Sequence, residues 1–489
     1  MKSFVKERFK LKRRFAALGC SIALISSLMA GCVAAGGVEP DKVLQNAFAV
    51  ASYEGSGSLS FQVTAGEAAK GYPDAAKLNN AVVEFTQMKQ QDKNNSSVTG
   101  VFKTSSGNIP FEAVQINKEW VIQAEGASKP LVLENAHAQK ESAAAPGFGL
   151  DLSSLNVEKL QNHLGSILSY APTLDSLTVS DANATINGEA LSLKKIHAEL
   201  KGGELTGIIQ KTLANILADQ ENGDALIRSI IGDLGYDASN AFTFAMVKES
   251  LRSLAEDASA LGVIFPAEDY LNNNNVLKLD LYVDGASQIR RIGFELGLQG
   301  LPQLDNGVSG VTITGSFDRW NINGAVTADK LSAEGAIKLS EDGGLAKYLL
   351  ALDKSSTAYK FLMEELKVNR KHIQLPPVGS EVPQTEVRPY LQGDFTMVPA
   401  RLVTEQLDAQ VEWNPDTYEV TVTDIWSGKK IVFKIGSTTV LVDGVEQTLD
   451  ASAVLGGDTT YVPVRIIAET FGAEVLWNQD TYVVTIVRN

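Results

Sequence analysis

Residues 395–423 read FTMVPARLVTEQLDAQVEWNPDTYEVTVT, and residues 459–487 read TTYVPVRIIAETFGAEVLWNQDTYVVTIV. The two stretches align without a gap: Arg401 and Arg465 are 64 residues apart, and so are Trp413 and Trp477. An internal repeat decides the architecture of its region, because each copy is one structural unit that packs against the other. The sequence therefore predicts a duplicated domain near the C-terminus.

Each copy is predicted to be a short helix followed by a β-hairpin. Pro399 and Pro463 stand where the helices begin, since proline lacks only an N–H that the first helical turn leaves unpaired. The apolar residues that follow form one stripe on each helix: Leu402, Val403 and Leu407 in the first copy, and Ile466, Ile467 and Phe471 in the second. The turn sequences that come next, Asn-Pro-Asp-Thr with Asp416 and Asn-Gln-Asp-Thr with Asp480, join two alternating strands.

The aromatic residues of the hairpins admit two interpretations. Alternation places Trp413 on the face of Val411, and Tyr418 on the face of the valines that follow it. Because Trp413 and Trp477 recur in register beside valines, we expect both to be core residues. The other interpretation is an exposed indole that stacks on sugar rings.

The repeated pattern V-P-x-R…E…A-x-V-x-W-N-x-D-T-Y-x-V-T resembles the copper amine oxidase N-terminal-like, or stalk, domain of many bacterial surface proteins, here over residues 387–489. In amine oxidases this domain is non-catalytic, so the resemblance implies a surface accessory domain. The Arg and Glu of each copy have the spacing of a surface ion pair, worth about 0.2–0.5 kcal/mol. The signature residues, to which we assign a structural role, are Pro399, Arg401, Glu405, Trp413, Asp416, Pro463, Arg465, Glu469, Trp477 and Asp480.

Residues 1–31 have the pattern of a lipoprotein signal peptide. A basic stretch precedes the apolar run FAALGCSIALISSLMAG, and Leu28-Met29-Ala30-Gly31-Cys32 resembles a bacterial lipobox. The resemblance implies a diacylglycerol on Cys32, a tether over residues 32–39, and a position on the outer face of the cell membrane. The alternative is a membrane-spanning anchor, for which the run is short beside the roughly 17–25 residues needed.

Charge and cysteine content narrow the possible partners. The net charge is −15, and removal of residues 1–31, with seven basic residues and one acidic residue, leaves −21. Such an acidic chain is not expected to bind nucleic acid. Cys20 and Cys32 both lie in the signal region, so no disulfide is expected within the mature chain.

Residues 40–370 predict a middle domain of the α+β class. Segments with a period of two, separated by turn residues, indicate a long antiparallel sheet, and three helical segments between residues 205 and 262 are inserted as a block. Residues 135–150 are a loop or a sub-boundary, and residues 371–386, with three prolines, are predicted to be a linker. An opening helix soon after Cys32, the strand GSLSFQV and the many strands that follow are similar in pattern to LolA/LppX-type envelope lipoproteins, over about residues 40–340. That resemblance implies a half-barrel around an apolar ligand; the alternative is a sheet packed solidly on helices.

No motif for phosphate, dinucleotide or zinc binding is present, and the four histidines are scattered, so we expect no enzyme, no cofactor and no metal. Two hypotheses remain. In the first, a lipid-anchored surface protein contacts an envelope or cell-wall component through the stalk domain and binds an apolar or envelope ligand in the middle domain. In the second, the chain is a structural spacer or adhesion-type protein without a small-molecule ligand.

Overall fold

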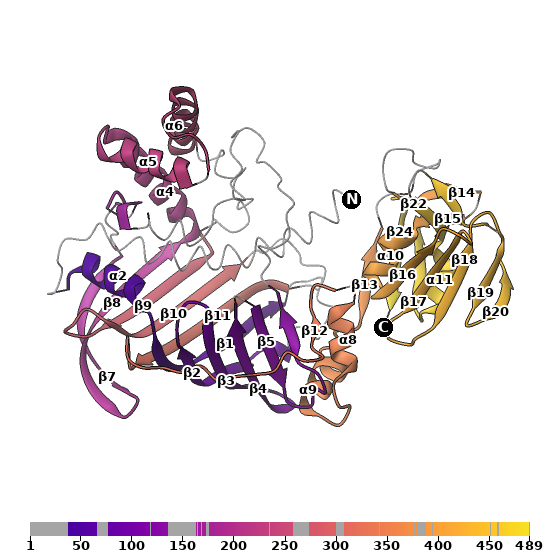
Figure 1. Ribbon diagram of the computed structural model, residues 1–489, viewed down its shortest axis with the longest axis horizontal. Coiled ribbons are helices and arrows are strands. Elements are labelled where there is room, and N and C mark those ends of the chain that lie inside the picture. The colour runs from indigo at the N-terminus through magenta and orange to yellow at the C-terminus, as the bar shows by residue number, and fades with distance from the viewer. Residues whose placement is uncertain are drawn as a thin grey trace. The chain divides into compact units, whose positions relative to one another are not determined.

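The computed structural model describes residues 38–65, 77–117, 119–134, 163, 165–167, 169–172, 176–233, 235–257, 273–299, 308–341, 343–375, 378, 388–393, 395–449, 451–456 and 459–488 (Figure 1). The chain divides into two compact units. One contains the described residues of Lys10–Lys118 and Asn135–Lys330, and the other contains Glu119–Glu134 and Leu331–Asn489. Residues 331–370, assigned above to the middle domain, share the second unit with the C-terminal repeats.

The first unit is a sheet of nine strands with helices. The strand order is β4-β3-β2-β1-β11-β10-β9-β8-β7, and all neighbours are antiparallel. The elements are α2 (Pro40–Ala49), β1 (Tyr53–Ala65), β2 (Val82–Gln90), β3 (Asn95–Thr104), β4 (Gly107–Ile116), β7 (Thr178–Ile186), β8 (Glu189–Lys201), α4 (Gly202–Ala218), α5 (Asn222–Asp233), α6 (Ala241–Glu256), β9 (Val276–Val283), β10 (Ile289–Gln299) and β11 (Val308–Trp320). The predicted α+β class is confirmed, and the predicted block of three helices is α4, α5 and α6.

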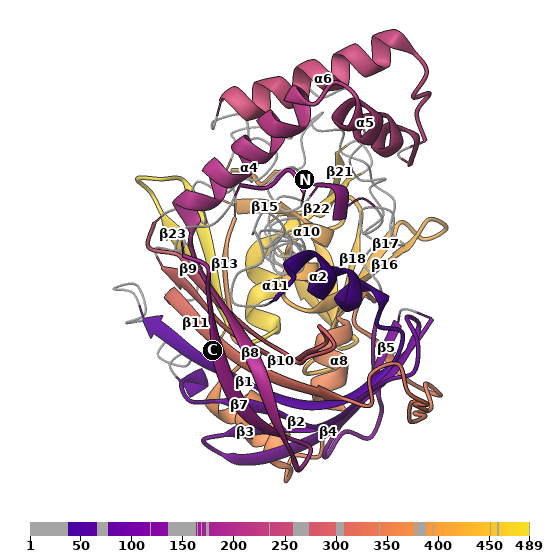
Figure 2. The ribbon, with the colours of Figure 1, turned by 90° about the vertical axis from the view of Figure 1, so that its left-hand side faces the viewer.

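The sheet is curved, and the helices lie on one side of it (Figure 2). Helix α2 packs on strands β8–β10 of this side, where Val38 and Val43 are buried against Ile196, Leu279 and their neighbours. Helix α4 adds Leu205 and Ile208 to the same cluster. Successive side chains of a strand point to opposite faces, and the face that α2 contacts carries Ile196, Leu279, Leu281 and Phe294 of strands β8–β10. We call it the apolar face, and the opposite one the polar face.

The second unit contains a small sheet, short helices and the repeats. Its elements are β5 (Glu119–Ala124), β6 (Leu131–Leu133), β12 (Ile337–Lys338), α8 (Gly344–Leu350), α9 (Thr357–Tyr359), the π-helix Lys360–Glu365, β13 (Lys371–Gln374), β14 (Tyr390–Gln392), β15 (Phe395–Pro399), α10 (Ala400–Gln406), β16 (Ala409–Asn414), β17 (Glu419–Asp424), β18 (Lys430–Lys434), β19 (Thr439–Val442), β20 (Val445–Thr448), β21 (Val454–Gly456), β22 (Thr459–Pro463), α11 (Val464–Thr470), β23 (Glu474–Asn478) and β24 (Val483–Arg488). Strand β12 pairs parallel with β6, so the prediction of purely antiparallel pairing is wrong there.

The repeats form a duplicated domain (described residues of 371–488) with internal two-fold symmetry. Strands β15 and β22 pair antiparallel, and Val398 lies opposite Val462, its equivalent in the other copy. Each copy continues as helix and hairpin, as predicted. The two stripes meet in one core that contains Val403, Leu407, Ile467 and Phe471. Pro399 and Pro463 end the preceding strands rather than opening the helices, since α10 and α11 begin one residue later.

The third strand of each repeat sheet comes from a different place in the chain. In the first copy, β18 pairs with β17, so that Ile431 lies opposite Val422. In the second copy, β13 pairs with β24, so that Ile373 lies opposite Ile486. Residues 371–374 of the predicted linker are therefore a strand of the duplicated domain. The linker prediction is wrong there because the strand's partner lies more than a hundred residues away.

Candidate functional site

Phenylalanine rings form a row across the apolar face of the nine-stranded sheet. The ring centroids of Phe85 and Phe111 are 6.2 Å apart, those of Phe85 and Phe317 are 5.7 Å apart, and those of Phe317 and Phe294 are 6.4 Å apart. All four side chains are half-buried. The row connects β4, β2, β11 and β10, and it continues the apolar surface on which α2 packs.

Glycines on the strands between make room for these rings. Gly57 lies between Phe85 and Phe317 in the pairing register, and a Cβ there would come within 2.4 Å of the Phe317 ring. Gly315 lies opposite Phe294, and a Cβ there would come within 2.4 Å of that ring. The rings therefore cover neighbouring glycine backbone, and the face becomes a continuous aromatic surface.

A positive charge lies at one end of this surface. Arg319 follows Phe317 by two residues on β11 and so shares its face, and its Cζ lies 5.6 Å from the centre of the Tyr53 ring. Burial lowers the pKa of the Arg319 guanidinium, and burial also raises the pKa of the Tyr53 hydroxyl. The pair is thus a desolvated cation beside an aromatic ring.

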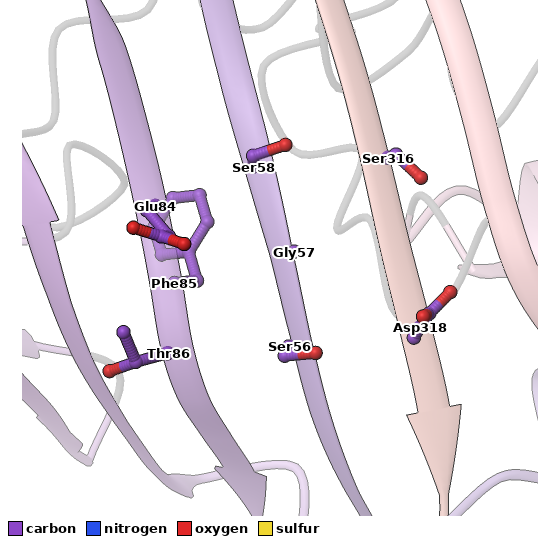
Figure 3. Close-up of a pocket in the computed structure, with 8 residues that line it drawn as sticks. All are labelled: Ser56, Gly57, Ser58, Glu84, Phe85, Thr86, Ser316 and Asp318. Carbon is purple, nitrogen blue, oxygen red and sulfur yellow. The ribbon is translucent and has the colours of Figure 1, made fainter. Parts of the chain in front are cut away.

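The polar face carries a shallow hollow. Its volume is about 470 Å³, and it lies over β1, β2 and β11 (Figure 3). Ser58, Ser316 and Glu84 lie opposite one another in the strand register. The full lining is Ser56, Gly57, Ser58, Glu84, Phe85, Thr86, Ser316 and Asp318. This lining is mainly polar, so the hollow is not the apolar cavity that an apolar ligand requires.

Trp413 and Trp477, the repeated tryptophans of the duplicated domain, are exposed. Trp413 retains 42% of its accessible surface and Trp477 retains 43%, so the prediction that they are core residues is wrong. Each indole packs edge-to-face on a tyrosine, Tyr418 at 6.1 Å and Tyr482 at 6.0 Å between ring centroids. Each pair lies beside the turn of its hairpin, and in the strand register Trp413 is opposite Val420 and Trp477 is opposite Val484, both core residues.

The hairpin turns explain part of the repeated motif. The side-chain oxygen of Asn414 accepts hydrogen bonds from the N–H groups of Asp416 and Thr417, and Asn478 does the same in the second copy. The chain then turns back at Tyr418 and Tyr482, whose φ angles are +53° and +54°. Tyr418 is therefore a turn residue, and its predicted place on a strand face was wrong because its backbone is left-handed. Asp416 and Asp480 lie in these turns, exposed.

Of the two predicted helix-surface ion pairs, the one in the second copy is seen in the described part of the chain. Arg465 pairs with Glu469 at 3.2 Å, and both are exposed. Arg401 is exposed, while the side chain of Glu405 lies outside the described residues. Cys32 also lies outside them, with the whole of residues 1–37.

A cluster of charged residues joins the two copies. Arg488 donates to Asp424 at 3.2 Å and to Asp408 at 3.4 Å. Asp408 also pairs with Lys371 of β13 at 2.8 Å and accepts from the indole of Trp426 at 2.9 Å. Asp424 and Arg488 occupy the same position of the two copies. The replacement of an acidic residue in one copy by a basic residue in the other was a sequence signal for this ion pair. Sequence reasoning missed the cluster.

The described residues contain neither a candidate metal site nor a candidate membrane-spanning helix. No group of three or more His, Cys, Asp or Glu side chains there could hold a metal ion. Among the helices that the structure describes, none has both the length and the apolar character needed to cross a membrane.

The duplicated domain matches a known family of protein domains. Residues 378–486 match the family model of the copper amine oxidase N-terminal domain, which confirms the resemblance deduced from the repeated motif. Comparison with curated proteins finds no match. The similarity to the copper amine oxidase N-terminal domain is therefore shown for about the last fifth of the chain.

Proposed function

We propose that this chain is a non-catalytic, lipid-anchored protein of the bacterial cell surface. Its nine-stranded sheet, a half-barrel, binds an apolar ligand, and its duplicated domain contacts an envelope or cell-wall component. The anchor is a diacylglycerol on Cys32, which follows the lipobox-like residues 28–31.

The observation that carries the ligand part of the proposal is the phenylalanine row. A sheet face that is filled only by its own helices needs well-interdigitated side chains of varied shape. Here the rings instead lie over glycine backbone and remain half-buried, so part of each ring is accessible. Accessible aromatic rings inside a curved sheet fit a flexible hydrocarbon chain, because such a chain needs apolar contact area and few polar groups.

Native mass spectrometry tests the ligand proposal. We expect a form starting at Val38, produced without the anchor, to show a mass excess that disappears on denaturation and matches a lipid. Phe317→Glu on the apolar face should reduce this excess, whereas Ser316→Glu, on the polar face of the same strand, should leave it unchanged. A clean mass, together with no uptake from an added lipid extract, would favour the structural spacer.

The exposed Trp–Tyr pairs support the envelope part of the proposal. Exposed aromatic rings that recur at equivalent tips are suited to stacking on a polymer with a repeating unit. The first hairpin bears Glu412, Asp416 and Glu419 and no basic residue, so an anionic polymer is disfavoured there. A neutral cell-wall glycan fits this surface better.

Replacing Trp413 and Trp477 together by Ala is expected to weaken binding to purified cell walls about tenfold or more, since a Trp anchor typically contributes at least about 2 kcal/mol. Sedimentation of the protein with insoluble walls measures this. The control replaces Leu455 and Leu476, which are exposed on the same domain, by Ala. If the control lowers binding as much as the Trp substitutions do, the pairs are not the contact surface.

A further inference from the structure

Arg319 lies at one end of a line of apolar side chains on the apolar face of strand β11. The alternation of β11 places Val311, Ile313, Phe317 and Arg319 on one side of the strand, so a charge follows a run of apolar positions. From Val311 to Phe317 the strand spans about 20 Å. These side chains, from Val311 to Arg319, form a stripe that matches an amphiphile, because it has a long apolar part and one charged end.

No counter-charge to Arg319 comes from the residues that the structure describes. Its neighbour Asp318 points to the other face and pairs with Arg291 there (Figure 3 shows Asp318 beside Ser316). The Nε atom of Arg319 is buried and finds no hydrogen-bond acceptor within the described part of the chain. The nearest aromatic partner, Tyr53, carries no negative charge at neutral pH, since its pKa is raised.

An unpaired cation on an apolar surface lowers the stability of a fold, and an apolar residue of similar size would be more stable at such a position. The guanidinium presents its N–H groups in a planar fork, and this fork matches a carboxylate or a phosphate. Binding of an anionic group would supply the missing counter-charge in a site from which water is largely excluded.

We infer that Arg319 receives the anionic headgroup of an amphiphilic ligand whose hydrocarbon tail lies along the apolar stripe of β11 and the phenylalanine row. The inference deepens the apolar ligand of the proposed function and rests on it. The ligand class is a single-headed anionic lipid. A fatty acid and a phosphate-bearing lipid share this chemistry.

Matched probes of one chain length test the headgroup. The full chain carrying Cys32→Ser, which prevents acylation, is titrated with dodecanoate, dodecyl phosphate and dodecanol in competition with a fluorescent fatty acid. We expect the anionic probes to bind about 10- to 100-fold more tightly than the alcohol, the range of a charge-assisted hydrogen bond. Tighter binding of dodecanoate would indicate a fatty acid as the ligand, and tighter binding of dodecyl phosphate would indicate a phospholipid.

The variant Arg319→Gln should bring the anionic probes to the affinity of dodecanol and leave the alcohol itself unchanged. Arg319→Lys should retain part of the preference, because it keeps the charge and loses the fork. The control is Arg291→Gln, which removes the same residue type from the opposite face of the sheet. Equal binding of all three probes by the unchanged chain, or an unchanged preference in Arg319→Gln, overturns the inference while the apolar ligand stands. Binding of none of the probes overturns the proposed function as well.

Thermal unfolding, measured without and with dodecanoate, provides a second readout. Without ligand, Arg319→Met should unfold at a higher temperature than the unchanged chain, because an unpaired charge is removed. With saturating dodecanoate the order should reverse, since the ligand stabilises only the chain that binds it. A lower unfolding temperature of Arg319→Met in both conditions would show that the guanidinium serves the fold and overturn the inference.

Discussion

Replacing Arg488 by Ala is expected to lower the free energy of unfolding of the duplicated domain by about 3–5 kcal/mol, the typical loss when one partner of a buried ion pair is removed. Only 8% of the Arg488 side chain is exposed, and only 1% of Asp424. The substitution would leave Asp424 buried without its cation, although Ser427 still donates to it. Asp408 would retain Lys371 as a partner.

Urea unfolding followed by tryptophan fluorescence measures this loss, and Trp426 is a local probe because its indole donates to Asp408. The control is Arg465→Ala, which breaks an exposed pair and should cost about 0.5 kcal/mol or less. A second variant, Arg488→Met with Asp424→Leu, should recover much of the stability, since it leaves no isolated charge at that contact. An Arg488→Ala loss no larger than that of Arg465→Ala would mean that the cluster is solvated.

Replacing Leu375 by Ala is expected to destabilise the duplicated domain by about 2–5 kcal/mol. Leu375 is 2% exposed and lies in the shared core, and its N–H donates to the carbonyl of Val484 at 2.9 Å. In the first copy, Phe433 of β18 occupies the equivalent place opposite Val420. The cost arises from the cavity and from lost apolar contact, although residue 375 precedes the span matched by the family model.

The neighbouring substitution Gln374→Ala is the control, because Gln374, the last residue of β13, is exposed and should change the free energy of unfolding by no more than about 0.5 kcal/mol. Phe433→Ala should cost about 3–5 kcal/mol and so set the scale for an established core position. If Leu375→Ala behaves like Gln374→Ala, strand β13 does not belong to the duplicated domain in solution.

The sequence by itself determined the local units of this protein. The repeat of 64 residues predicted helix and hairpin twice, because the spacing of Val403 and Leu407 and the turn residues after Asn414 act within a few positions. The period of two predicted the strands of the large sheet for the same reason. Turn and period signals are properties of neighbouring residues, so they are readable without a structure.

Only the tertiary structure decided which strands and charges meet. Strand β13 pairs with β24 across the length of the domain, and Arg488 reaches Asp424 in the other copy. Trp413 is exposed although it lies opposite the core residue Val420 and its alternation matches that of a core residue. Among the described residues Arg319 has no counter-charge, because its strand neighbour Asp318 faces the other way. Each of these facts depends on pairing between distant segments, for which the local pattern carries no signal.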